Sequence, residues 1–370
     1  MVNAGANLKI SYTLFTPGPV DVPDEILQEM AQPILYHRDV TFSDMLAETQ
    51  TALNKILGSN GRTFILTSSG TGALEAACSN LLSKNDRPIV AMCGKFGQRW
   101  YEICKAFGVD AISLSADYGK SVSPDSLERI LKQQDKPTVV FTTLTETSTG
   151  ALNDIHAFGE IVHAHEGYLV VDGVAGIGAD ECPQDKWHVD ILVGASQKAL
   201  MAPAGIGFLS VNERAFARTK QSDLPKYYLD LAIYEKFLIK NQTPWTPAVN
   251  IIYALKMGAD KILKIGISEH LKHHQKLADH VRNRLANLGL SLLPEHPSNA
   301  LTVIKMPTGM ESTGIIQAIR DRFGILFANG QAELRGKILR IGHMGNYTIP
   351  KIDRALDALE TVIKQQRGTL

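Results

Sequence analysis

Between residues 62 and 211, short apolar runs alternate with amphipathic stretches, and this alternation constrains the fold more than any other feature. The runs are nearly continuous in Val, Ile and Leu, as in "RTFILTSS", "PTVVFTTL" and "GYLVVDGV". The segments between them carry apolar residues at helical spacing, as in "TGALEAACSNLLS", "SPDSLERILKQQD" and "DIHAFGEIVHAHE". Strands buried on both faces that alternate with helices predict an α/β domain around a mostly parallel sheet.

The last third of the chain follows a different pattern. The segment "PWTPAVNIIYALKMGADKIL" begins with a proline-punctuated break and continues into a long helical pattern, and "IPKIDRALDALETVIKQQ" predicts a final helix. Between them, "GLSLLPEHPSNALTVIKMP" is typical of strands. The 370 residues also exceed what a single core normally holds. We therefore expect an N-terminal segment over 1–20, a large domain over 21–250 and a smaller α+β domain over 251–370.

Composition argues against several classes of partner. Lys and Arg together number 38, as do Asp and Glu, so no basic excess favours nucleic acid or an anionic membrane. No apolar run reaches the roughly 20 residues needed to cross a bilayer, and the N-terminus lacks the pattern of a signal peptide. The four cysteines form no CxxC pair, and neither they nor the histidines show metal-like spacing. We expect a cytoplasmic protein with reduced thiols and no metal, whose partners are small molecules and a second copy of itself.

The stretch "RTFILTSSGTGALEAA" predicts a phosphate site. In an open α/β sheet, ligands bind beyond the carboxyl ends of the strands. Here a strand is followed directly by a helix, whose free N–H groups and positive dipole end attract an anion. Gly70 and Gly72 would allow close backbone approach, and the hydroxyls of Ser69 and Thr71 would add direct bonds. An ordinary strand-to-helix turn is the alternative, which this stretch alone does not exclude.

Two charged residues follow later strands in the same way. Asp172 ends "GYLVVD", where a carboxylate needs a partner, either a protonated ring nitrogen or another group of the protein. Lys198 follows the next apolar run, and a buried amine readily loses its proton and becomes a nucleophile. A surface lysine is the alternative. The phosphate site, Asp172 and Lys198 together match the phosphate, ring nitrogen and aldehyde of pyridoxal phosphate.

Further motifs extend this pattern over nearly the whole chain, from about residue 14 to 346. With them, the chain resembles the class V pyridoxal phosphate aminotransferases, which have the aspartate aminotransferase-like fold (fold type I). It is most similar to the alanine/serine–glyoxylate and serine–pyruvate branch. The resemblance implies a homodimer with shared active sites. The motifs are "TPGPVDVP", "SSGTGALEAA", "GKFGQRW", "TETSTGAL", "VVDGVAGIG", "GASQKALMAPAG" and "LRIGHMG".

The resemblance also implies roles for single residues. Lys198 would form the Schiff base with the cofactor, and Asp172 would pair with the ring nitrogen. Arg340 would bind the substrate α-carboxylate, with Gly18 close to the substrate and Tyr36 near the mouth of the site. The remaining cofactor contacts would be Ser69, Gly70, Thr71 and Gln197 at the phosphate, Phe96 and Val174 on the two ring faces, Thr147 near the ring hydroxyl, and Thr246 at the phosphate of the other subunit.

The chain departs from its relatives at three places. Thr243 stands where relatives with the glyoxylate activity often carry Tyr, which puts one phosphate contact in doubt. Gly173 replaces a small polar residue after Asp172. The segment 36–38, Tyr-His-Arg, is bulkier than in animal glyoxylate enzymes, and we expect it to influence substrate choice. Arg38 would either face a distal carboxylate or form a surface ion pair.

The favoured function is transfer of an amino group from alanine or serine to glyoxylate or pyruvate, with ping-pong kinetics. An aspartate- or ureidoglycine-type donor stays open. A cysteine desulfurase or other lyase would need a reactive Cys, which residues 324–346 lack, and usually a His where Phe96 stands. A phosphonate aminotransferase shares "TPGP", but Arg340 favours carboxylate substrates. A non-catalytic binding subunit would predict loss of Lys198, Asp172 and Arg340, which are all present.

Overall fold

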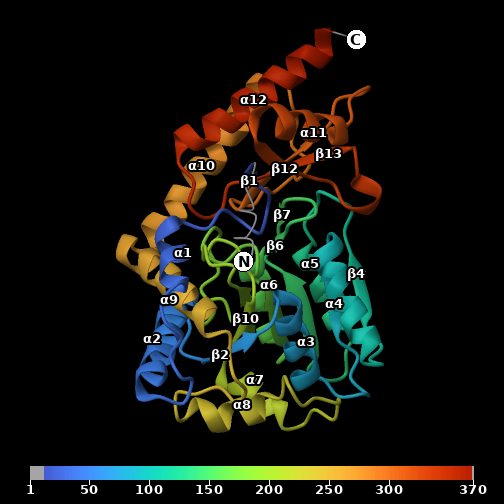
Figure 1. The fold of residues 1–370 in the computed structure, drawn as a ribbon. Helices are drawn as coiled ribbons and strands as arrows, with labels where there is room; N and C mark the ends of the chain where they lie inside the picture. The colour runs from blue at the N-terminus through green and yellow to red at the C-terminus, as the bar shows by residue number, and fades with distance from the viewer. Residues whose placement is uncertain (1–11, 369–370) are drawn as a thin grey trace.

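The computed structural model describes residues 12–368, and a seven-stranded sheet forms the centre of its larger part (Figure 1). The strand order is β2-β10-β9-β8-β5-β3-β4. Only β10 runs antiparallel to its neighbours, β9 and β2, while the other pairs are parallel. The predicted α/β fold with a mostly parallel sheet is therefore confirmed. The strands are β2 (Arg62–Thr67), β3 (Ile89–Met92), β4 (Ile112–Ser115), β5 (Val139–Thr143), β8 (Tyr168–Asp172), β9 (Ile191–Ala195) and β10 (Ile206–Val211).

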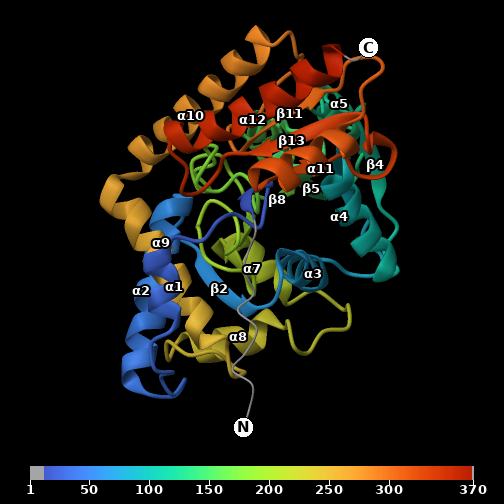
Figure 2. The same ribbon diagram turned by 45° about the horizontal axis from the view of Figure 1, so that its top comes forward.

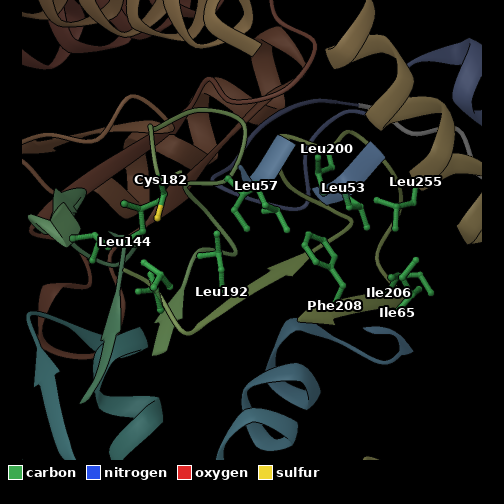
Figure 3. Packing of buried hydrophobic residues seen from close by; sticks show 14 of the residues in the cluster. Leu53, Leu57, Ile65, Leu144, Cys182, Leu192, Leu200, Ile206, Phe208 and Leu255 are labelled. Carbon is green, nitrogen blue, oxygen red and sulfur yellow. The ribbon is translucent and has the colours of Figure 1, made fainter. Parts of the chain in front are cut away.

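Successive residues of a strand point to opposite faces of the sheet, so these apolar strands present buried side chains on both faces. Helices cover each face. In β2, Phe64 and Leu66 join one core and Ile65 joins the other. Figure 3 shows the second core, where Leu53 of α2 and Leu255 of α9 lie on the side of Ile65. The first core packs under α3 (Gly70–Leu81), α4 (Lys95–Ala106), α7 (Glu213–Thr219) and α8 (Leu231–Leu238), and the second under α1 (Asp24–Met30), α2 (Val40–Leu57), α5 (Pro124–Leu131), α6 (Ile155–Ala164) and α9 (Val249–Ile265).

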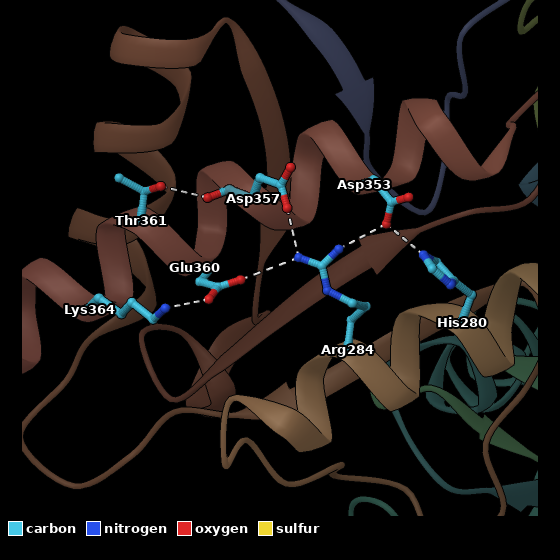
Figure 4. A network of polar contacts seen from close by, with 7 residues as sticks. All are labelled: His280, Arg284, Asp353, Asp357, Glu360, Thr361 and Lys364. Atoms are coloured by element: carbon cyan, nitrogen blue, oxygen red, sulfur yellow. Dashed lines mark hydrogen bonds and ion pairs between the residues drawn. The ribbon is translucent and has the colours of Figure 1, made fainter.

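A four-stranded sheet forms the smaller part, in the order β1-β12-β13-β11 (Figure 1, top). Arg284 of α10 ties two helices of this part together, because its guanidinium pairs with Asp353 at 2.9 Å and Asp357 at 2.7 Å in α12 (Figure 4). The elements are β1 (Thr13–Phe15), β11 (Leu301–Lys305), β12 (Ile325–Asn329), β13 (Ile338–Gly342), α10 (Ile267–Asn287), α11 (Ser312–Phe323), α12 (Ile349–Gly368) and a 3₁₀ turn at Ala332–Leu334. A two-stranded hairpin, β6 (Thr145–Glu146) and β7 (Ala151–Leu152), lies in the larger part.

The chain passes between the two parts more than once. β1 lies near the N-terminus but pairs in parallel with β12 of the smaller sheet. Helix α9 begins at Val249 yet packs against α1 and α2 of the larger part, as Figure 2 also shows. The limits 1–20, 21–250 and 251–370 stay a prediction. Among the helices within residues 12–368, none has the length and apolar character that spanning a membrane requires.

Candidate active site

A pocket opens at the carboxyl ends of β2, β5, β8 and β9 in the larger part. Parallel strands bring residues far apart in sequence to this edge of the sheet. Each strand contributes the polar residue or turn that follows its apolar run. The pocket is lined by the predicted residues Ser69, Gly70, Thr71, Phe96, Thr147, Asp172, Val174, Gln197 and Lys198, and by Leu74, Arg99, Thr145 and Ala175, which the sequence analysis did not single out.

Lys198 lies in the turn after β9 and is 9% exposed. Its Nζ donates a hydrogen bond to the backbone oxygen of Pro17 at 2.6 Å. Burial lowers the pKa of its amine to about 8, although the nearby carboxylate of Asp172 opposes this shift. Gly18 has a φ of +117°, and a Cβ there would overlap Nζ. Glycine is therefore required where the chain passes the amine. The lowered pKa makes the neutral, nucleophilic form of the amine far more accessible than in an ordinary lysine.

Asp172 is the last residue of β8 and is buried. Its Oδ1 accepts a hydrogen bond from the backbone N–H of Val174 at 2.9 Å. Burial raises the pKa of this carboxyl to about 6; the bond from Val174 opposes the shift, and the charge of Glu146 adds to it. A carboxylate that is costly to leave unpaired suits a cationic ring nitrogen as its partner.

The N-terminus of α3 forms one end of the pocket. Ser69 is the N-cap, and its Oγ accepts from Gly72 N–H at 3.4 Å. A Cβ on Gly70 would come within 3.0 Å of Val174, so a side chain would crowd the pocket there. Gln197 lines the same pocket, where its side-chain N–H groups would be the donors to an anion. This end therefore fits a phosphate.

Phe96 is placed by a carboxylate that the sequence analysis missed. The backbone N–H groups of Phe96 and Gly97, at the start of α4, donate to Glu146 at 3.0 and 2.9 Å. Ser148 Oγ donates to the same carboxylate at 2.6 Å. A negative group at a helix N-terminus is favourable, so Glu146 fixes the position of the first turn. The available signal was an acidic residue inside the otherwise uncharged motif "TETSTGAL".

Arg99 also lines the pocket without having been predicted. It stands one turn after Phe96 on α4, and its Cζ lies 4.7 Å from the centroid of the Phe96 ring. Its Nη1 donates to Thr71 Oγ1 at 3.1 Å, at the start of α3. The spacing of three residues from Phe96, which puts both side chains on one helix face, was the signal in the sequence.

Arg340 lies in β13 of the smaller part, next to the pocket. Its Nε donates to the backbone oxygen of Asn329 at 2.8 Å and its Nη1 to that of Thr147 at 3.1 Å. Burial lowers the pKa of its guanidinium to about 10. The acceptors are neutral carbonyl groups, so its charge stays available for an anion beside Thr147.

Two predicted residues, Tyr36 and Thr246, are exposed at the surface. Tyr36 is 67% exposed, and its ring meets that of His37 edge to face. Thr246 is exposed, with its Oγ1 3.5 Å from His37 Nε2. Both residues therefore lie at the surface of the single chain, and their roles depend on whether a second subunit covers them.

Arg38 and Thr243 form hydrogen bonds with the backbone of the loop that precedes Thr246. Arg38 donates to the backbone oxygens of Thr243 at 2.6 Å and Pro244 at 3.1 Å. The hydroxyl of Thr243 donates to the backbone oxygen of Trp245 at 2.7 Å. Within the described residues Arg38 forms no ion pair, and its guanidinium bonds to backbone carbonyls of this loop. No group of three or more His, Cys, Asp or Glu side chains within residues 12–368 is arranged to hold a metal ion.

The family model "Aminotransferase class-V" matches residues 17–344, which include Gly18, the whole pocket and Arg340. The chain belongs to the class V aminotransferase family. Enzymes of this family and fold generally use pyridoxal phosphate. The protein is therefore a transaminase of the pyridoxal phosphate-dependent class, with fold type I. The predicted family, fold and enzyme class are confirmed.

Three similar proteins illustrate the range of the family. The L-aspartate–glyoxylate aminotransferase of Paracoccus denitrificans is 32% identical, over 90% of this chain and 87% of that protein. A solved structure of alanine–glyoxylate aminotransferase from Nostoc sp. is 27% identical with a TM-score of 0.93, covering 98% of this chain and 97% of that one. A Synechococcus protein named soluble hydrogenase, small subunit, is 37% identical over 95% of this chain and 93% of its own length.

Proposed function

We propose that this protein transfers the amino group of a small L-amino acid, alanine or serine, to glyoxylate or pyruvate, with pyridoxal phosphate held covalently by Lys198. The observation that carries the proposal is the placement of Lys198 and Asp172 in one pocket that ends at the N-terminus of α3. A nucleophilic amine, a partner for a cationic ring and an anion site match three groups of one cofactor.

The residues present fit this cofactor. Ser69, Gly70 and Thr71 would hold the phosphate, together with the side-chain N–H groups of Gln197. The proposed stacking residues, Phe96 and Val174, both line the pocket, with Phe96 fixed by Glu146; Thr147, another lining residue, would lie near the ring hydroxyl.

Pyridoxal phosphate, when bound, supplies an aldehyde and an electron-withdrawing ring that accepts the charge left at the amino acid Cα. Asp172 would keep the ring nitrogen protonated, because its own carboxylate is buried and needs a cationic partner. Arg340 would bind the α-carboxylate with its fork of donors and so orient the Cα–H bond. The Lys198 Nζ would remove the proton from Cα and return it in the second half of a ping-pong cycle.

The proposed substrates follow from the relatives. Glyoxylate is named for both the Paracoccus and the Nostoc aminotransferase, which supports glyoxylate as the acceptor. Alanine is named as the donor for one and L-aspartate for the other. Aspartate is therefore the second candidate donor. An aspartate donor would need a cation for its distal carboxylate, and Arg38 is already engaged by backbone oxygens of the 243–244 loop.

A role as a subunit of a larger complex is favoured by the relatives named as soluble hydrogenase subunits, such as the Synechococcus protein. The presence of Lys198, Asp172 and Arg340 in a formed site supports catalysis instead. We further propose a homodimer in which Thr246 of each chain reaches the other's phosphate site, which the exposure of Thr246 and Tyr36 supports. We also propose a cytoplasmic location, which the four cysteines support because all are free and buried.

The test is to mix the purified holoprotein with single amino acids and record its visible absorption. L-Alanine or L-serine is expected to bleach the band of the bound aldehyde form, and glyoxylate or pyruvate is expected to restore it. D-Alanine and the Lys198→Ala variant serve as controls. If aspartate alone bleaches the band, the second candidate donor replaces the first. If no amino acid of a broad panel does so while cofactor is bound, the proposal is wrong and the subunit role is favoured.

A further inference from the structure

The guanidinium of Arg99 lies at the cofactor pocket without an acidic partner. Its hydrogen bond is to a neutral hydroxyl, Thr71 Oγ1, at 3.1 Å. No carboxylate oxygen of residues 12–368 forms a salt bridge with it, whereas Arg62, Arg214, Arg218 and Arg284 each have one. A half-buried cation that lines a pocket and lacks a counter-ion is suited to an anionic ligand.

The contacts of Arg99 place this cation at one end of the pocket. Thr71 belongs to the first turn of α3, whose N–H groups already favour an anion there. The other contact holds the side chain in place, because Cζ lies 4.7 Å from the centroid of Phe96. Arg340, the cation assigned to the substrate carboxylate, instead bonds to Thr147 and Asn329. The two arginines thus have separate positions around the pocket.

We propose that Arg99 is the residue that neutralises the cofactor phosphate from within the same chain, next to the hydroxyl of Thr71. This inference rests on the proposed function and deepens it. The N-terminal turn of α3 provides partial charges only, and Ser69, Thr71 and Gln197 are neutral. A full positive charge would stabilise a phosphate dianion in this pocket further, and Arg99 supplies one with a planar fork of donors. Stacked on Phe96, it also links the phosphate site to the residue assigned to the ring face.

The test compares two ligands that differ only in the phosphate. Apoprotein of the wild type and of Arg99→Met is titrated with pyridoxal 5′-phosphate and with pyridoxal, and the dissociation constants are measured by absorption. Loss of a charge-assisted contact is expected to weaken pyridoxal 5′-phosphate about ten- to hundredfold and to leave pyridoxal nearly unchanged. Arg99→Lys, which keeps the charge but loses the fork, is expected to fall between.

Two controls separate this role from a structural one. Arg87→Met removes an exposed arginine that pairs with Asp110 at 3.5 Å and does not line the pocket, so both ligands should bind it as they bind the wild type. Pyridoxal binding by Arg99→Met shows that the pocket is intact. Equal weakening of both ligands would assign Arg99 to packing of Phe96 and overturn the proposal, as would unchanged binding of both. If the wild type binds neither ligand, the proposed function itself fails.

Discussion

At the scale of single residues, the site contains two titratable groups, Lys198 and Asp172, whose charged forms are destabilised by burial and by nearby charges of the same sign. Lys198 is buried beside Asp172 and beside two other cations, Arg340 and Arg99, that oppose a positive amine. Asp172 is buried with Glu146 nearby, which opposes a negative carboxylate. Each group thus lies closer to its neutral form than it would in water. The neutral amine can attack an aldehyde, and the buried carboxylate is stabilised in its ionised form when a cationic ring binds beside it.

The lowered pKa of Lys198 predicts a pH profile for cofactor uptake by the apoprotein. Only the unprotonated amine reacts, so the rate should rise with pH up to about 8 and level off above it. Below this pH the rate of cofactor uptake should fall by about tenfold for each pH unit. Stopped-flow absorption from about two pH units below this pKa to about two above it measures the profile. A rate that keeps climbing toward the ordinary lysine value of 10.5 would show that burial does not shift the amine.

At the scale of elements, the sequence predicted much of what the structure shows. The helical patterns at α3, α5, α6, α9 and α12 and the apolar runs of the large sheet are confirmed. These elements are long or strongly patterned, so the period of their apolar residues specifies them. Of the stretch "GLSLLPEHPSNALTVIKMP", only Leu301–Lys305 forms a named strand, because prolines and polar residues interrupt the rest.

The missed site residues have a common cause. Glu146 and Arg99 act through contacts between elements, since one caps α4 from β6 and the other reaches from α4 to α3. Such contacts depend on how helices pack on the sheet, which local patterns do not specify. By contrast, Asp172 and Lys198 follow apolar runs directly, so the strand-end rule placed them in one pocket.

Glu146 predicts how the start of α4 is held. Glu146→Gln keeps the shape but leaves one acceptor oxygen for donors from Phe96, Gly97 and Ser148. Because buried donors then lose partners, the free energy of unfolding should fall by about 1–3 kcal/mol in urea titrations. Glu102→Gln, the same change at an exposed position of the same helix, is the matched control and should cost less. Equal stability of Glu146→Gln and the wild type would show that the carboxylate does not hold this turn.

At the scale of the whole molecule, the two parts of the fold meet around the pocket. The larger part supplies the residues of the sheet edge, and Arg340 reaches Thr147 from the smaller sheet. Yet Tyr36 and Thr246, to which the family resemblance assigns places near the active site, are exposed in the single chain. A second copy that covers this surface would account for both observations.

A mixed-dimer experiment tests the shared site. Lys198→Ala and Thr246→Glu should each be nearly inactive alone, the second because its carboxylate repels the cofactor phosphate. If Thr246 acts on the other subunit, mixed dimers contain one intact site, and random mixing should restore about a quarter of the wild-type sites. Activity of subunits refolded together measures this. No recovery, with mixed dimers shown to form, would mean that Thr246 acts within its own chain.

The most direct test of the account is to locate the covalent attachment of the cofactor. The holoprotein is reduced with borohydride, digested and analysed by mass spectrometry. We predict that the reduced pyridoxal phosphate adduct is carried by the peptide that contains Lys198, and that Lys198→Ala carries none. An adduct on another lysine, or an unmodified Lys198 in protein prepared with excess cofactor, would contradict the central claim.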